Sequence, residues 1–214
     1  MRAAGADAQA FLARAAERLR SAPPGALEPH SNPKGDHELQ FDGPFRPPAQ
    51  PPKSAAVLVP IVMHDGEAMV LLTQRAAGLR NHSGQIAFPG GRIDPDDAGP
   101  LEAALRESQE EIGLGRGLIR PLGYLDLYLT GSGYRIAPVV GVVEPDFTLV
   151  LNPWEVADVF ECPLAFLMDP ANHHVEEREW RGFRRRAFAI PWGERHIWGV
   201  TAGIVRQLYE RIYG

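Results

Sequence analysis

Residues 88–114 read FPGGRIDPDDAGPLEAALRESQEEIGL, a glycine-rich turn followed by a mixed apolar and acidic stretch. The two consecutive glycines let the backbone turn sharply and approach a ligand closely. Pro100 suits the first helical turn, where its missing N–H costs nothing, and Gly113 suits the left-handed residue that ends a helix. The stretch therefore predicts a turn and then a helix over residues 100–112.

The predicted helix has two different faces. At about 100° per residue, the residues that share its apolar side, which we expect to be buried, are Leu101, Leu105, Ser108 and Ile112. Glu107 and Glu111 fall on another face, with Glu110 beside them. Like charges one turn apart destabilise an isolated helix, so something must offset them.

The acidic cluster by itself has two interpretations. A solvated acidic face is the simpler one. The alternative is a site for Mg²⁺ or Mn²⁺, because these hard cations prefer carboxylate oxygen. Arg106 directly precedes the cluster and is expected to pair with one carboxylate and fix its rotamer. A calcium loop of the EF-hand type over residues 94–105 is excluded, because Leu105 would occupy its last ligand position.

The loop before the helix favours the metal interpretation. The whole stretch resembles the Nudix box, in which a glycine and an acidic loop precede the pattern Arg-Glu-apolar-x-Glu-Glu-x-Gly-apolar. The matching residues are Gly91, Arg106, Glu107, Glu110, Glu111, Gly113 and Leu114. Ser108 stands where an aliphatic residue is usual. Ala98 replaces the loop glutamate in an interval one residue longer than the standard box, so Asp96 or Asp97 is left as its substitute.

This resemblance implies both a fold and a chemistry. The fold is an α/β/α sandwich with a mixed β-sheet. Glu107 and Glu111 would bind the metal with help from Glu110, and Glu110 or Glu107 would accept a proton from the attacking water. Arg106 would support these carboxylates.

A second motif lies directly upstream. Residues 71–91 look like the additional motif of the coenzyme A diphosphatase subgroup, Leu-Leu-Thr-x-Arg-Ser-Ala followed by Arg, Gly and Phe-Pro-Gly-Gly, with Ala76 in place of its serine. The longer box loop is also typical of that subgroup, and residues 198–202 are similar to the start of its last helix. The substrate-binding residues that this resemblance suggests are Arg75, Arg80, His82, Gln85, Gly90 and Gly91. For His82, capping of the loop is an equal alternative.

The resemblance implies metal-dependent hydrolysis of coenzyme A, or a derivative of it, to 3′,5′-ADP and 4′-phosphopantetheine. Alternatives are another nucleoside diphosphate derivative such as ADP-ribose, and a non-catalytic module that only binds a nucleotide. The intact carboxylates argue against the last. A diphosphate isomerase is disfavoured, because its chemistry calls for a cysteine and Cys162 lies far from the box.

Composition limits the other function classes. The chain has 214 residues, 44% of them apolar and 23% charged, which fits a globular protein with a substantial core. Its net charge of −5 argues against a general nucleic-acid binder. Cys162 is the only cysteine and is interpreted as a buried structural thiol. With neither a long apolar run nor a secretory signal, we expect a cytoplasmic protein with a small-molecule substrate and no membrane partner, and leave a homodimer open.

The chain divides into two parts by pattern. Residues 1–53 are expected to form an N-terminal helix (6–21) and a proline-rich extension, and residues 54–214 the Nudix domain. Strands are predicted at 55–63, 68–73, 118–129, 134–143, 154–160, 183–190 and 196–198, with helices at 163–168 and 200–212. Residues 173–174 are interpreted as loop, and Arg184, Arg185 and Arg186 as surface. Mixed strands and helices with hairpins predict an α/β sandwich.

Overall fold

The computed structural model describes residues 4–24, 34–35, 39, 51–79, 81–180 and 183–214. Its helices are α1 (Ala4–Arg18), α2 (Pro100–Ile112), α3 (Leu164–Leu167) and α4 (Val200–Tyr213), with 3₁₀ turns at Arg116–Leu118 and Pro170–Asn172. Its strands are β1 (Lys34–Gly35), β2 (Lys53–His64), β3 (Glu67–Arg75), β4 (Ile86–Ala87), β5 (Gly90–Arg92), β6 (Ile119–Tyr124), β7 (Tyr128–Leu129), β8 (Tyr134–Val143), β9 (Val156–Pro163), β10 (His174–Trp180), β11 (Phe183–Trp192) and β12 (Arg195–Trp198). The proline-rich stretch 44–52 lies almost wholly outside the described residues.

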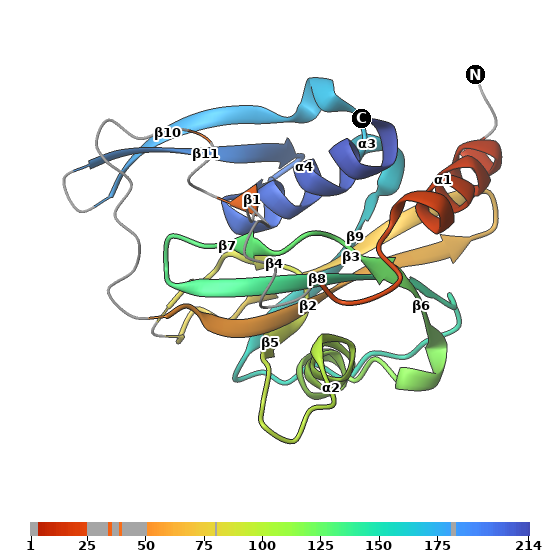
Figure 1. The fold of residues 1–214 in the computed structure, drawn as a ribbon, viewed down its shortest axis with the longest axis horizontal. Coiled ribbons are helices and arrows are strands. Elements are labelled where there is room, and N and C mark those ends of the chain that lie inside the picture. Colours follow the sequence, from red (N-terminus) through yellow and green to blue (C-terminus); the bar gives the residue numbers. More distant parts are fainter. Residues whose placement is uncertain (1–3, 25–33, 36–38, 40–50, 80, 181–182) are drawn as a thin grey trace.

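A mixed sheet forms the middle layer of the molecule. Its central strand, β2, runs parallel to β8 and antiparallel to β3 and β5. In Figure 1, α2 lies on one side of this sheet and α4 on the other, with β10 and β11 beyond α4. The second sheet, β10-β11-β12, is antiparallel. The predicted α/β/α sandwich with a mixed sheet is therefore confirmed.

Two hydrophobic clusters occupy the two sides of the sheet. Because successive side chains of a strand point to opposite faces, Leu71 packs in the cluster that contains α2, and Leu72 in the one that contains α4. Both leucines are at most 1% exposed. Burial of such a side chain stabilises the fold by about 1.5–3 kcal/mol. Strand β3 is therefore fixed from both sides, and it ends at Arg75.

The N-terminal helix packs against the same chain. Its buried residues are Ala8, Phe11, Ala15 and, just beyond its end, Leu19, all in the cluster on the α4 side. Arg20 and Tyr124 then exchange two backbone hydrogen bonds of 3.0 and 2.9 Å. The helix ends three residues earlier than its apolar spacing predicts. The division of the chain at residues 53 and 54 stays a prediction.

Three segments differ from the sequence-based prediction. The single strand expected over residues 118–129 is divided into β6 and β7, with residues 125–127 outside both. The strand expected from residue 154 begins at Val156, because Asn152 ends the preceding loop in a turn and accepts the backbone N–H groups of Glu155 and Val156. The interpretation of His174 as a loop residue was wrong, since it begins β10. This strand lacks an apolar alternation, and its Val175 is 50% exposed. No helix in the described part of the chain is long and apolar enough to cross a membrane.

Candidate active site

Helix α2 is positioned by local signals and by packing. Pro100 lies in its first turn, and Gly113 ends it with φ of 70° while its N–H donates to the Gln109 carbonyl. A side chain at Gly113 would collide with the backbone of Val150, which adds a second reason for glycine there. Ser108 is fully buried and its hydroxyl donates to the carbonyl of Ala104 at 2.7 Å. That intrahelical bond satisfies the polar group that stands in an aliphatic position.

Glu111 lies inside the molecule. Its side chain is 5% exposed, although the helical pattern placed it on an acidic face away from the buried one. The Gly90 N–H donates to Oε2 at 3.1 Å, and Nη1 of Arg75 lies 3.8 Å from Oε1. Burial raises the pKa of Glu111 to about 7 despite these two partners, and the charges of Glu107 and Glu155 add to the effect. The Gly90 N–H and the Arg75 guanidinium therefore do not offset the cost of burying the charge of Glu111.

Glu107 lies directly over the glycine turn. A Cβ at Gly91 would collide with the Glu107 carboxyl group, so the missing side chain makes room for it. Burial raises the pKa of Glu107, while the hydrogen bond from Arg106 acts in the opposite direction. The glycine turn, which was predicted to approach a ligand, thus supports both carboxylates. The missing side chain of Gly91 leaves room for Glu107, and the N–H of Gly90 donates to Glu111.

Arg106 joins the loop to the helix. Its Nε and Nη2 donate to the two oxygens of Asp97 at 3.1 and 3.0 Å, and Nη1 donates to Glu107 at 2.9 Å and Glu110 at 3.3 Å. Nη2 also donates to the carbonyl of Arg92. The hydrogen bond from Arg106 lowers the pKa of Asp97. Arg106 was expected to pair with one carboxylate. It forms hydrogen bonds to three, and Asp97, one of the two loop candidates, is among them.

Glu110 has the outermost position of the three helix glutamates. Its side chain is 56% exposed, and its contact with the site is the 3.3 Å hydrogen bond from Arg106. It can therefore reach solvent or a substrate without first breaking out of a buried environment.

The upstream motif forms a wall next to Glu111. The N–H of Arg75 donates to the Gln85 carbonyl at 2.9 Å, and the N–H of Gly84 donates to the Arg75 carbonyl at 3.2 Å. His82 has φ of 56°, and its Nδ1 lies 2.8 Å from Oε1 of Gln85, so this imidazole does cap the loop. Arg80 lies outside the described residues. Nε of Arg75 is buried and has no hydrogen-bond partner among the residues that are described.

Glu155 lies close enough for its charge to act on Glu107 and Glu111, and its position was missed in the sequence. Its side chain accepts from Asn152 at 3.3 Å, and its carbonyl accepts from Ala76 at 2.8 Å. In the sequence, Glu155 is only an acidic residue directly before a strand. The pairing of β9 with β3, which places Val156 opposite Arg75, is what brings Glu155 to this part of the molecule.

The donor atoms suit a hard divalent cation. Two carboxylates whose pKa values are raised by burial lie beside a third, and the nearest guanidinium is 3.8 Å from Glu111. In the described ranges no three His, Cys, Asp or Glu side chains converge into a complete metal site. Magnesium usually takes one or two carboxylates and completes its shell with water and substrate phosphate, so Glu107 and Glu111 fit it.

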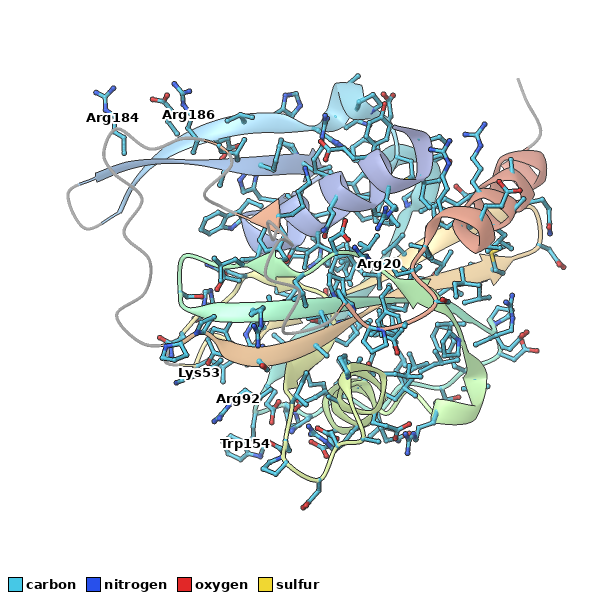
Figure 2. The ribbon with its side chains drawn as sticks, in the orientation of Figure 1. Arg20, Lys53, Arg92, Trp154, Arg184 and Arg186 are labelled. Carbon is cyan, nitrogen blue, oxygen red and sulfur yellow. The ribbon has the colours of Figure 1, made fainter. Side chains whose placement is uncertain are left out.

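Two arginines of the triple-arginine stretch lie away from this group. Figure 2 shows Arg184 and Arg186 at the outer end of β11, on the opposite side of the large sheet from α2. Both side chains are exposed, and Arg186 forms an ion pair of 2.8 Å with Glu177. The interpretation of these two residues as surface agrees with their positions.

Comparison with known proteins identifies the family. The NUDIX domain model matches residues 52–184. The chain belongs to the Nudix hydrolase family. The "Uncharacterized Nudix hydrolase NudL" of Photorhabdus laumondii is 38% identical over 176 residues, covering 82% of this chain and 93% of that protein. NudL of Escherichia coli K12 is 41% identical over 161 residues, covering 75% and 83%.

Among solved structures, DR0079 from Deinococcus radiodurans is similar with a TM-score of 0.49 and 15% identity, covering 78% of this chain and 88% of that one. Nudix hydrolases act on the diphosphate bonds of nucleoside diphosphate derivatives and generally use divalent cations such as Mg²⁺ or Mn²⁺. The acidic helix and the glycine turn of this chain lie within the matched Nudix region.

Proposed function

We propose that this Nudix hydrolase cleaves the diphosphate bond of coenzyme A, or of a derivative of it, and releases 3′,5′-ADP and 4′-phosphopantetheine. The observation that carries the proposal is the position of Arg75. This arginine belongs to the segment that resembles the coenzyme A diphosphatase motif, and its guanidinium lies 3.8 Å from the buried Glu111. Residues 71–91, whose resemblance suggests the substrate, thus lie next to Glu111, one of the carboxylates that suggest the reaction.

Local positive charge supports an anionic substrate on an acidic chain. Coenzyme A carries a diphosphate and a ribose 3′-phosphate, whereas the chain has a net charge of −5. Arginine presents a planar fork of donors that matches phosphate oxygens. The Arg75 side chain is 28% exposed, which leaves part of its guanidinium group accessible to a phosphate oxygen.

The metal would be held by Glu107 and Glu111, with Glu110 assisting from the exposed side. A divalent cation bound there supplies positive charge to the diphosphate oxygens and lowers the pKa of a coordinated water. Arg106 keeps Glu107 in place through the 2.9 Å hydrogen bond, and is itself fixed by Asp97. The chain itself therefore contributes two oriented carboxylates, Glu107 and Glu111, and the positive charge of Arg75 beside them.

In the proposed reaction, water attacks one phosphorus in line with the leaving oxygen. Its oxygen forms the new P–O bond, the bridging P–O bond breaks, and the leaving group departs as a phosphate monoester. Glu110 or Glu107 accepts the proton of the water. Arg75, Gly90 and Gly91 position the diphosphate.

A substrate panel tests the proposal. The purified chain is assayed with Mg²⁺ or Mn²⁺ against coenzyme A, ADP-ribose, dinucleoside polyphosphates and NADH, with the products separated by chromatography. We expect the highest kcat/KM for coenzyme A or a derivative of it, with 3′,5′-ADP as one product. A higher value for ADP-ribose would contradict the substrate assignment. Binding without hydrolysis of any of these compounds would contradict the activity.

A further inference from the structure

A cavity lies beside the upstream motif, which spans residues 71–91. Its volume is about 560 Å³, within the size range of small-molecule sites. Its lining comes from the end of β3, the loop before β4, and the β11–β12 turn with β12: Gln74, Ser83, Gly84, Gln85, Ile86, Glu194, Arg195, His196 and Trp198. Neither the metal site nor the sequence motifs account for Arg195 and His196 of β12.

The cavity adjoins the candidate active site through the backbone. Gln74 directly precedes Arg75, and Gln85 accepts the backbone N–H of Arg75 through its carbonyl. Arg75 lies next to Glu111 of α2, whereas Gln74 contacts Arg195 of β12, and the pairing of β3 with β9 shifts register between these two residues. A ligand whose diphosphate lies at Arg75 needs a long flexible arm to reach the cavity.

The wall of the cavity is held rigidly. Arg195 donates to Oε1 of Gln74 at 2.7 Å and to Asp158 at 2.5 Å. Its guanidinium lies 4.4 Å from the centre of the Phe160 ring, which in turn stacks on Trp192. The position of Gln74 is therefore set before any ligand arrives.

Gln74 and Gln85 both line the cavity, and one end of each side-chain amide is already engaged. The amide oxygen of Gln74 is taken by Arg195, and that of Gln85 by Nδ1 of His82. Each NH₂ group has no hydrogen-bond partner among the described residues and is left to donate to a ligand. Two such donors complement two carbonyl oxygens. They are a poorer match for adenine, which a glutamine reads with its oxygen and its NH₂ together.

The charges at the cavity disfavour an anion. Arg195 is neutralised by Asp158, and His196 lies 3.2 Å from Glu176. Glu194 adds a negative charge at the exposed edge. Counting only the residues that the structure describes, a phosphate group would therefore meet no excess positive charge at the cavity, whereas a neutral amide chain would lie beside the apolar Ile86 and Trp198.

We propose that this cavity binds the neutral, amide-bearing arm of the substrate, with Gln74 and Gln85 donating to its two amide carbonyls. The inference rests on the proposed function, since the pantetheine arm of coenzyme A is a flexible chain with two amides joined to a diphosphate. The nucleotide end then remains outside the cavity. Gln74 and Gln85 act on recognition and take no part in the chemical step.

The test compares the binding of the two products by calorimetry in the presence of Mg²⁺. 4′-Phosphopantetheine carries the arm, and 3′,5′-ADP carries the nucleotide without it. In the double variant Gln74→Met/Gln85→Met, which keeps side-chain length and removes both donors, we expect the Kd of 4′-phosphopantetheine to rise about tenfold or more. The Kd of 3′,5′-ADP should stay within twofold. The exposed Gln9 of α1 supplies the matched control, Gln9→Met.

Several results would overturn the assignment: equal weakening of both products, weakening of 3′,5′-ADP alone, no change in either, or no binding of 4′-phosphopantetheine to the unaltered protein. The single variant Gln85→Met leaves the Gln74–Arg195 contact in place and should give part of the effect, which separates loss of a donor from loosening of the wall. Failure of the proposed function has a different signature, because the unaltered protein would then not hydrolyse coenzyme A in the substrate panel.

Discussion

The Arg75 guanidinium and the buried carboxylate of Glu111 face each other at 3.8 Å, from the end of β3 and the last turn of α2. That distance is longer than a direct hydrogen bond. Arg75, a candidate for substrate binding, thus lies next to one of the two proposed metal ligands, and its Nε is buried without a hydrogen-bond partner among the described residues.

Replacing Arg75 tests its forked recognition of phosphate. Lysine keeps the positive charge and loses the planar donor pair. We expect Arg75→Lys to lower kcat/KM for coenzyme A by about tenfold to a hundredfold, with a melting temperature close to that of the parent protein. The exposed Arg120 on β6 gives the control Arg120→Lys, which should leave kcat/KM unchanged. Equal activity of the two variants would remove Arg75 from the site.

Replacing Glu111 by glutamine should lower the activity and raise the stability of the protein. Its buried charge lies near Glu107 and Glu155, so Glu111→Gln removes repulsion while the new amide oxygen can still accept from Gly90. We expect loss of nearly all turnover. In the presence of a chelator the variant should gain about 1 kcal/mol, or roughly 2–4 °C in melting temperature. A variant that melts lower than the parent in chelator would contradict the electrostatic description of the site.

The loop acid can be identified by a pair of substitutions. Asp97 holds Arg106 with two hydrogen bonds, whereas Asp96 is its exposed neighbour. We expect Asp97→Asn to lower kcat by about tenfold to a hundredfold, since residues that orient metal ligands usually have effects of that size. Asp96→Asn should leave kcat unchanged. The reverse order would assign the role to Asp96.

Cys162 should be chemically inert in the folded protein. It is fully buried on β9, and burial raises the pKa of its thiol to about 12. Because the thiolate is the reactive form, a disulfide reagent should label the native chain very slowly between pH 7 and 9. The chain unfolded in urea should react at one thiol, at a rate that rises with pH toward the ordinary thiol pKa. Rapid labelling of the native chain would contradict the burial.

The sequence predicted best where local signals determine the structure. Pro100 and Gly113 mark both ends of α2, and the predicted bounds 134–143 of β8 coincide with those in the structure. Strand β10 was missed because its sequence, HVEEREW, has no regular alternation of apolar and polar residues. Such a strand is identified only through its pairing with β11.

Two features of the site depend on contacts that are distant in sequence. The burial of Glu111 follows from the loop at Gly90, 21 residues earlier, which covers a helix face that looks acidic and exposed in isolation. The proximity of Glu155 follows from the register of β9 against β3. Helical periodicity carries no information about either contact.

The most direct measurement is the rate of coenzyme A hydrolysis by Glu107→Gln. This substitution keeps the shape of the side chain and removes one of the two proposed metal ligands, so we expect kcat/KM to fall by about a thousandfold or more, with a circular dichroism spectrum like that of the parent. Glu102→Gln, on the first turn of the same helix, serves as the control and should retain full activity. If Glu107→Gln keeps near-normal activity in a folded protein, the carboxylate helix does not bind the catalytic metal.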